Sequence, residues 1–317
     1  MNTTDQRNGI SIVIPTIGRD SLTKLLASIH LDDTLKLHEI LIVANSEICE
    51  NLKQSYNEYK CIKLVTQEKS NISKSRNKGI SNSNFNTISP IDDDDLWVNG
   101  RAKLFQDNLQ INENAVVFGS AQFNRTRRYK RNQKGSNQRI DFEDFAKIFN
   151  PKILSKQNFF LQVGNCAFRK NINLPKFNEE LTYLEDQIWI LDLLQSGFMV
   201  TQIKETTIEY FFSRSRANRR WNIVTEQEIF KRLSKVDLSL ARGYIFQRSL
   251  KSLALSSNDN LFNKAKAEIL IEFDPRGKEK LQILFLSIIN ISVRVLRKEL
   301  SICKNVFKIF LKIRSLR

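Results

Sequence analysis

Short apolar runs alternate with amphipathic stretches over the first sixty-odd residues of the chain. Ile10 to Pro15, Glu39 to Val43 and Ile62 to Thr66 are apolar runs of strand length. Ser21 to Ile29 and Glu47 to Tyr59 lie between them and place apolar side chains at helical spacing. This alternation predicts a parallel α/β sheet with right-handed crossovers.

The alternation of predicted helices and strands continues up to a run of acidic residues. Ser73 to Ser81 is predicted to be a helix, and Asn86 to Ile91 a strand that leads directly into four aspartates. Ligands of such sheets bind at the carboxyl ends of the strands. We therefore expect the chain after Pro15, Val43 and Ile91 to converge on one crevice.

The rest of the chain has a weaker pattern. Four further strands and two helices are predicted, the strands at Val116 to Phe123, Asn165 to Arg169, Met199 to Ile203 and Thr207 to Phe212, and the helices at Asp141 to Phe149 and Leu184 to Ser196. Arg125 to Arg139 carries seven Lys and Arg residues and no acid, and we expect a mobile loop there.

From Thr225 onward the pattern is helical, with breaks near 256–260 and 274–277. We predict a catalytic domain over residues 1–224, with a nucleotide half at about 1–97 and an acceptor half at about 98–224. Residues 225–317 would form a helical, basic C-terminal region.

Composition limits the partners that are plausible. The chain has 317 residues, is 41% hydrophobic and carries a formal net charge of +16, which favours nucleic acid, acidic membranes or phosphorylated substrates. Its four cysteines form no CxxC pair and it has two histidines, so a zinc site is not expected. Met1 to Gly9 is polar and no stretch is long and apolar enough to cross a bilayer, so we expect a cytoplasmic protein.

The aspartate run, Asp92 to Asp95, is the main chemical signal. Four adjacent carboxylates repel each other unless a cation matches their charge. Mg²⁺ or Mn²⁺ with oxygen ligands would do so and leave positions for phosphate oxygens. The alternative is a solvated acidic loop, which the position at the end of an apolar strand disfavours.

The chain resembles glycosyltransferase family 2, the inverting enzymes of GT-A fold, over about residues 10 to 215. The segments that carry the resemblance are Ile10 to Thr16, Glu39 to Ser46, Asn71 to Gly79, Thr87 to Trp97 and Tyr183 to Leu191, in the family's order. The resemblance implies a Rossmann-like, mostly parallel sheet flanked by helices. It also implies transfer from a nucleotide-sugar donor, in particular a UDP-sugar, to a glycan or lipid-linked glycan in surface polysaccharide or lipopolysaccharide synthesis.

The resemblance also assigns roles to the acidic residues. Asp92 and Asp94 match the two aspartates of the DxD motif, which contact the nucleoside and the metal. Asp95 matches a further acidic position that would support the metal, and Asp93 fills the variable position beside the donor. Asp186 matches the catalytic base, and Glu185 would position it or the acceptor.

Five further positions match the family's nucleotide-binding segments, namely Pro15, Thr16, Asn45, Arg76 and Asn77. The family usually has an aspartate where Asn45 stands, and many members have a third metal ligand, a histidine, after the Glu-Asp helix. Because no histidine lies beyond His38 here, carboxylates and water would have to complete the metal shell.

Two basic segments are left for other roles. Phe211 to Trp221 could fold over the donor diphosphate or be a solvated loop. Cys303 to Lys312 places Lys304, Lys308 and Lys312 on one helical face, which favours peripheral attachment to the inner, anionic membrane surface over packing on the protein.

Two other functions remain open on the sequence. A nucleotidyltransferase can share the sheet and the metal aspartates, but only Gly18 stands where a glycine-rich phosphate loop would lie. A nucleic-acid-binding protein would explain the positive charge, but the basic residues do not interleave with aromatic ones in a recognisable module, and we expect no nucleic-acid partner.

Overall fold

The computed structural model describes thirteen stretches of the chain and the single residue 149. The stretches are 9–56, 59–68, 71–110, 114–124, 130–132, 137–146, 161–171, 173–181, 183–211, 222–249, 259–280, 282–284 and 286–287. The chain divides into two compact units, Met1–Ala146 with Ser155–Arg220, and Lys147–Leu154 with Trp221–Arg317. We describe each unit by itself.

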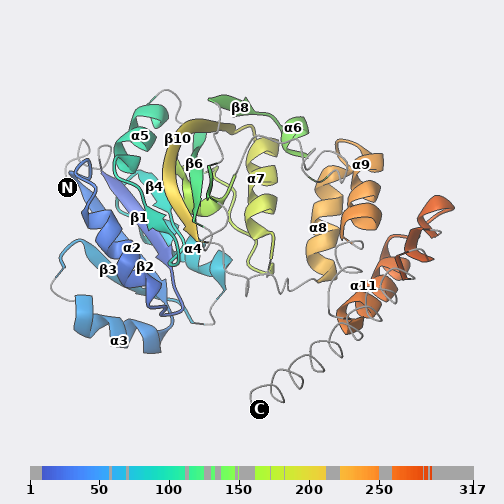
Figure 1. Ribbon diagram of the computed structural model, residues 1–317, viewed down its shortest axis with the longest axis horizontal. Coiled ribbons are helices and arrows are strands. Elements are labelled where there is room, and N and C mark those ends of the chain that lie inside the picture. Colours follow the sequence, from blue (N-terminus) through green and yellow to red (C-terminus); the bar gives the residue numbers. More distant parts are fainter. Residues whose placement is uncertain are drawn as a thin grey trace, which may run out of the picture. The chain divides into compact units, whose positions relative to one another are not determined.

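The first unit is built on one sheet (Figure 1). Its main strands, in spatial order, are β3 (Ile62–Thr66), β2 (His38–Ala44), β1 (Ile10–Pro15), β4 (Thr87–Pro90), β9 (Cys166–Arg169), β6 (Ala115–Asn124), β10 (Met199–Phe211) and β5 (Leu96–Trp97). Strands β3, β2, β1 and β4 are parallel, and β6 is parallel to β10. Only β9 and β5 run antiparallel to their neighbours in this order. This is the mostly parallel α/β sheet that the sequence predicts.

The helices of the first unit pack against this sheet or against one another. They are α2 (Ser21–His30), α3 (Ser46–Tyr56), α4 (Ile72–Asn82), α5 (Arg101–Leu109), α6 (Phe142–Ala146) and α7 (Glu185–Gln195). Helix α2 buries Leu22, Leu25, Leu26 and Ile29 in one core cluster with the inner strands. Helix α4 approaches β1 closely at Gly79, where a Cβ atom would lie 2.3 Å from Val13 Cγ1. The glycine of the Asn71 to Gly79 segment is therefore required by packing.

Three local predictions were wrong. Helix α5 was not predicted, because Ala102, Phe105 and Leu109 are its only buried apolar positions and Gly100 offers no side-chain cap. The two strands predicted at 199–203 and 207–212 are one strand, β10, which continues through register shifts between Gln202 and Ile208. The segment predicted as a loop contains β7 (Lys130–Asn132) and the start of β8 (Gln138–Ile140), which pair with β6 and β10.

The described part of the second unit is helical, in agreement with the predicted change of pattern. It contains α8 (Ile223–Leu233), α9 (Leu238–Gly243), a π-helical turn (Tyr244–Ser249) and α11 (Asp259–Glu272). Asn222 and Asp237 cap α8 and α9 by accepting backbone N–H groups of Thr225 and Ser239 at 2.8 and 2.7 Å. None of the helices described is both long and apolar enough to span a membrane. The predicted amphipathic stretch at Cys303 to Lys312 lies outside the described residues.

Candidate active site

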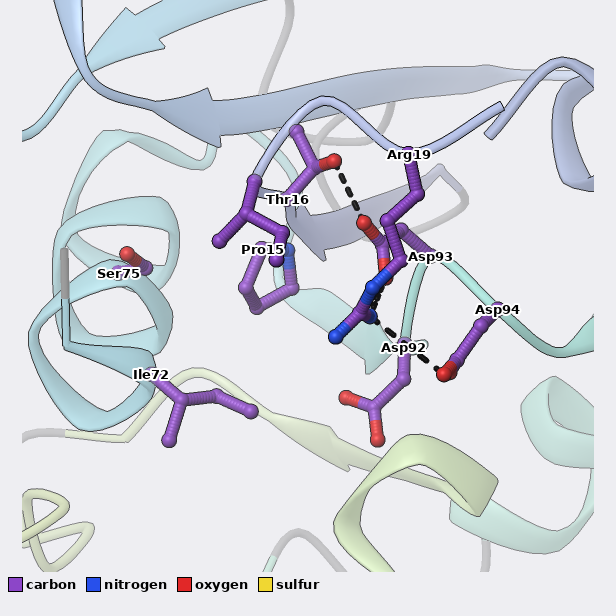
Figure 2. A pocket seen from close by; sticks show the side chains of 9 residues that line it. Pro15, Thr16, Arg19, Ile72, Ser75, Asp92, Asp93 and Asp94 are labelled. Carbon is purple, nitrogen blue, oxygen red and sulfur yellow. Dashed lines mark hydrogen bonds and ion pairs between the residues drawn. The ribbon is translucent and has the colours of Figure 1, made fainter. Parts of the chain in front are cut away.

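The aspartate run lies at the carboxyl end of β4, beside the end of β1. Ile91, the residue before the run, donates its N–H to Val13 O at 3.0 Å and so extends the pairing of these two parallel strands. A cavity of about 250 Å³ opens at this edge (Figure 2). It is lined by Pro15, Thr16, Ile17, Arg19, Ile72, Ser75, Asp92, Asp93 and Asp94. The strand ends after β1 and β4 therefore form one crevice, as predicted, whereas the chain after Val43, the third strand end expected there, does not line it.

Asp92 and Glu185 share one arginine. Arg76 donates from Nη2 to Asp92 Oδ1 and from Nη1 to Glu185 Oε1, both at 3.0 Å. The Arg76 side chain is only 3% exposed, and the two carboxylates raise its pKa against the opposing effect of burial. This arginine brings together three segments that are up to 109 residues apart in the chain.

Asp93 is the most completely bonded of the four aspartates. Its Oδ2 accepts a hydrogen bond from Thr16 Oγ1 at 2.6 Å, and its Oδ1 forms an ion pair with Arg19. The side chain is 2% exposed. Asp93 therefore fastens the aspartate run to the turn after β1, a role that its position as the variable member of the motif does not indicate.

Asp94 and Asp95 lie in different surroundings. Asp94 lines the cavity and lies 3.4 Å from Arg19 Nη1. Asp95 is buried and accepts the N–H of Phe211 at 3.3 Å, and its Oδ2 has no hydrogen-bond partner. Burial, and then the charge of Asp92, raise the pKa of Asp95 to about 8.

The Glu-Asp pair begins helix α7 and directly follows a residue with a strained backbone. Leu184 has φ of 56°, a left-handed conformation that costs a leucine of order 1–3 kcal/mol and is typical of functional sites. Burial, and then the neighbouring charge of Glu185, raise the pKa of Asp186 to about 7, although Arg76 opposes the shift. A carboxyl group with a pKa near 7 can accept a proton at neutral pH and release it again.

Two of the five predicted nucleotide-contact positions, Pro15 and Thr16, line the cavity. A third, Arg76, bonds the lining residue Asp92. The other two are occupied elsewhere. Asn45 Oδ1 accepts the N–H of Ile48 at 2.8 Å and begins helix α3, and Asn77 exchanges hydrogen bonds with the backbone of Phe177 at 2.9 and 3.0 Å.

The structure also reveals a residue that the sequence does not single out. Arg101 is fully buried and donates to Ser89 Oγ, Pro90 O and Gly164 O at 3.0, 3.0 and 3.1 Å. Its guanidinium lies over the rings of Trp97 and Phe105, and burial lowers its pKa to about 9. No sequence signal could have identified it, because its partners are backbone carbonyls and a serine from other segments.

The carboxylates of the run do not converge on one point. In the part of the chain that the structure describes, no group of three or more His, Cys, Asp and Glu side chains is arranged to hold a metal ion. The donor types nevertheless fit a hard cation, because Asp92 and Asp94 both face the cavity and Asp95 keeps a buried oxygen without a partner. Of the basic segment predicted to cover the donor, only Phe211 is described.

Comparison with known proteins gives a consistent result. The model of the family described as glycosyl transferase family 2 matches residues 11–174. No curated protein matches the chain. Among solved structures, Staphylococcus aureus TarS 1-349 is similar with a TM-score of 0.54 and 14% identity, with 92% of each chain covered. The complex of TarS 1-349 with UDP-GlcNAc gives a TM-score of 0.55 at 14% identity and the same coverage. At this identity the likeness concerns the fold alone.

Proposed function

The chain belongs to glycosyl transferase family 2, and from that membership we propose that it transfers a sugar from a UDP-sugar to a glycan or lipid-linked glycan, with inversion at the anomeric carbon. One observation carries the proposal. Arg76 bridges Asp92 and Glu185 at 3.0 Å each, so the aspartate run and the Glu-Asp helix belong to one site. Family membership also favours this function over the nucleotidyltransferase and nucleic-acid-binding alternatives.

The donor would lie in the cavity at the ends of β1 and β4. Its nucleoside would contact Pro15 and Thr16, and its diphosphate would lie near Asp92 and Asp94. Mg²⁺ or Mn²⁺ held by Asp94 and Asp92 would offset the phosphate charge and stabilise the leaving diphosphate. UDP-GlcNAc is a suitable first donor to test, because the similar TarS structures include complexes with UDP and with UDP-GlcNAc.

Asp186 would act as the general base. Its carboxylate takes the proton from the acceptor hydroxyl while that oxygen attacks the anomeric carbon from the face opposite the diphosphate. The bond between the anomeric carbon and the phosphate oxygen breaks, and the nucleoside diphosphate leaves with the electron pair. Glu185, held by Arg76, would fix the position of the helix start that carries Asp186.

The acceptor and the cellular site are further parts of the proposal. A lipid-linked acceptor would place the protein at the inner surface of the cell membrane. The spacing of Lys304, Lys308 and Lys312 supports attachment to anionic lipid through the C-terminal segment. Sedimentation with vesicles that contain phosphatidylglycerol, compared with phosphatidylcholine vesicles, tests this, and equal sedimentation with both would contradict it.

A panel of nucleotide sugars tests the central proposal. Each donor is added with Mn²⁺, and the melting temperature is measured before and after chelation with EDTA. We expect a UDP-sugar to raise the melting temperature and chelation to abolish the rise, because ligand binding to the folded state stabilises it. If no sugar nucleotide changes the melting temperature, the assignment of the cavity to the donor is wrong.

A further inference from the structure

A positively charged side chain, that of Arg19, lies beside the predicted metal-binding carboxylates. The guanidinium of Arg19 forms an ion pair with Asp93 Oδ1 and lies 3.4 Å from Asp94 Oδ2. Figure 2 shows it reaching across the cavity from the turn after β1 to both carboxylates. Arg19, Asp93 and Asp94 all line this cavity.

Asp93 is buried and fixed in place, Asp94 is half-buried, and Arg19 is the most exposed member of this contact. Asp93 is 2% exposed and is also fixed by Thr16, and Asp94 is 17% exposed. The Arg19 side chain is 45% exposed, and among the described residues it makes no side-chain hydrogen bond or ion pair beyond Asp93 and Asp94. It follows Gly18, whose φ of 79° belongs to a conformation that glycine adopts without strain. The exposed guanidinium can therefore turn toward a ligand in the cavity when another cation takes over the charge of the carboxylates.

A divalent ion bound to Asp94 would conflict with Arg19 in this position. Oxygen ligands hold Mg²⁺ or Mn²⁺ at roughly 2.1 Å, so the ion and the guanidinium would lie close together on one carboxylate and repel each other. A diphosphate in the cavity removes the conflict, because it offers the guanidinium a second pair of anionic oxygens that match its planar fork.

We propose that Arg19 is a built-in counter-cation of the donor site. It neutralises Asp93 and Asp94 in the free protein, yields Asp94 to the metal ion, and turns to the donor diphosphate when the donor binds. This inference rests on the proposed function. It makes Arg19 a competitor of the metal in the absence of nucleotide and a donor-binding residue in its presence, so metal and nucleotide binding are positively coupled.

The test measures Mn²⁺ binding to the free protein, with the paramagnetic resonance signal of unbound Mn²⁺ as the readout. Arg19→Gln removes the competing charge, and we expect it to bind Mn²⁺ at least about tenfold more tightly than the wild type. Lys24→Gln makes the same change in net charge at an exposed position of α2 and should alter the affinity less than about twofold. Arg19→Lys keeps a cation and should stay closer to the wild type than Arg19→Gln does.

A second titration, of UDP at saturating Mn²⁺, completes the test. We expect Arg19→Gln to bind UDP about tenfold more weakly than the wild type, because the guanidinium contact to the diphosphate is lost. Weaker UDP binding together with tighter Mn²⁺ binding supports the inference, since general damage to the site would weaken both.

Three outcomes would overturn the inference. The first is that Arg19→Gln binds Mn²⁺ no more tightly than Lys24→Gln, and the second is that it binds UDP as well as the wild type. The third is that no variant binds Mn²⁺ at millimolar concentration. Retained UDP binding by the wild type in any of these cases leaves the donor site of the proposed function in place. Absence of UDP binding from every variant, including the wild type, instead contradicts the proposed function itself.

Discussion

Arg76 and Arg101 are two buried arginines close to the aspartate run, but they donate hydrogen bonds to different kinds of oxygen. Arg76 bonds the carboxylates of Asp92 and Glu185, one of which lines the cavity. Arg101 bonds Ser89 Oγ and the carbonyls of Pro90 and Gly164, and its guanidinium lies over two aromatic rings, those of Trp97 and Phe105. An arginine that is paired with carboxylates can change partners when a ligand binds or when a carboxylate takes up a proton. An arginine that is bonded to backbone carbonyls holds chain segments in place.

This contrast separates the site into a chemical region around Arg76 and a scaffold region around Arg101. Substitutions in the chemical region should change turnover and its pH dependence while the protein stays folded. Substitutions in the scaffold region should lower the free energy of unfolding without a specific effect on the pH profile. The predictions below test that separation.

The largest effect should come from Asp186→Asn. Loss of the general base should lower turnover by about 10²–10⁴-fold, while the affinity for the donor stays within about threefold of the wild type. Steady-state kinetics and a donor titration measure the two quantities. Asp192→Asn, on the same helix, is the matched control, and near-normal turnover of Asp186→Asn would refute the assignment of the base.

The same variant should become more stable than the wild type at alkaline pH. The pKa of Asp186 is raised to about 7 in the folded protein, so its ionisation opposes folding, and wild-type stability falls as pH rises from about 4 through 7. Asparagine removes this loss. We expect a gain of about 4 kcal/mol at pH 8 that disappears near pH 4, measured by urea denaturation. A gain that does not depend on pH would contradict the raised pKa.

In the scaffold region, Arg101→Met should lower the free energy of unfolding by about 3 kcal/mol or more. It leaves the buried oxygens of Ser89, Pro90 and Gly164 without the guanidinium that bonds them. Urea denaturation measures the change. Lys103→Met, on the same helix but 65% exposed, should change it by less than about 0.5 kcal/mol. Equal effects of the two substitutions would show that Arg101 has no scaffold role.

Thr16→Val should have the smallest effect, because it removes a single hydroxyl, which bonds Asp93 and the N–H of Gly18. The substitution removes the 2.6 Å hydrogen bond to buried Asp93 and should cost about 1–2 kcal/mol of stability. Thr16→Ser keeps the hydroxyl and should retain most of that stability. If valine and serine have the same effect in urea denaturation, the hydrogen bond contributes nothing.

The sequence identified the chemical region better than the scaffold region, for a physical reason. Asp92, Arg76 and Glu185 stand in short motifs whose order can be recognised along the chain. The contacts of Arg19 and Thr16 with Asp93 join residues 74 and 77 positions apart, and nothing local indicates them. The role of Arg101 cannot be predicted from the sequence either, because every residue type offers a backbone carbonyl as a partner.

The strands show the same limit of local patterns. Strands β1 and β2 were predicted because buried parallel strands form nearly continuous apolar runs. Strand β10 was divided in two because Lys204 and Glu205 interrupt its apolar pattern, although pairing with β6 resumes beyond the irregularity. A bulge of this kind depends on the partner strand, which the sequence of one segment does not reveal.

The pH dependence of kcat/KM in the wild type and in Arg76→Gln tests the central claim most directly, namely that one arginine joins the donor aspartate to the Glu-Asp pair that carries the catalytic base. In the wild type, kcat/KM should fall about tenfold per pH unit below about 7, as Asp186 becomes protonated. Removal of the Arg76 charge should raise the pKa of Asp186, so the acidic limb should move to higher pH by about one unit. Arg242→Gln, in the second unit, should leave the limb in place. An acidic limb at the same pH in the wild type and in Arg76→Gln would contradict the account.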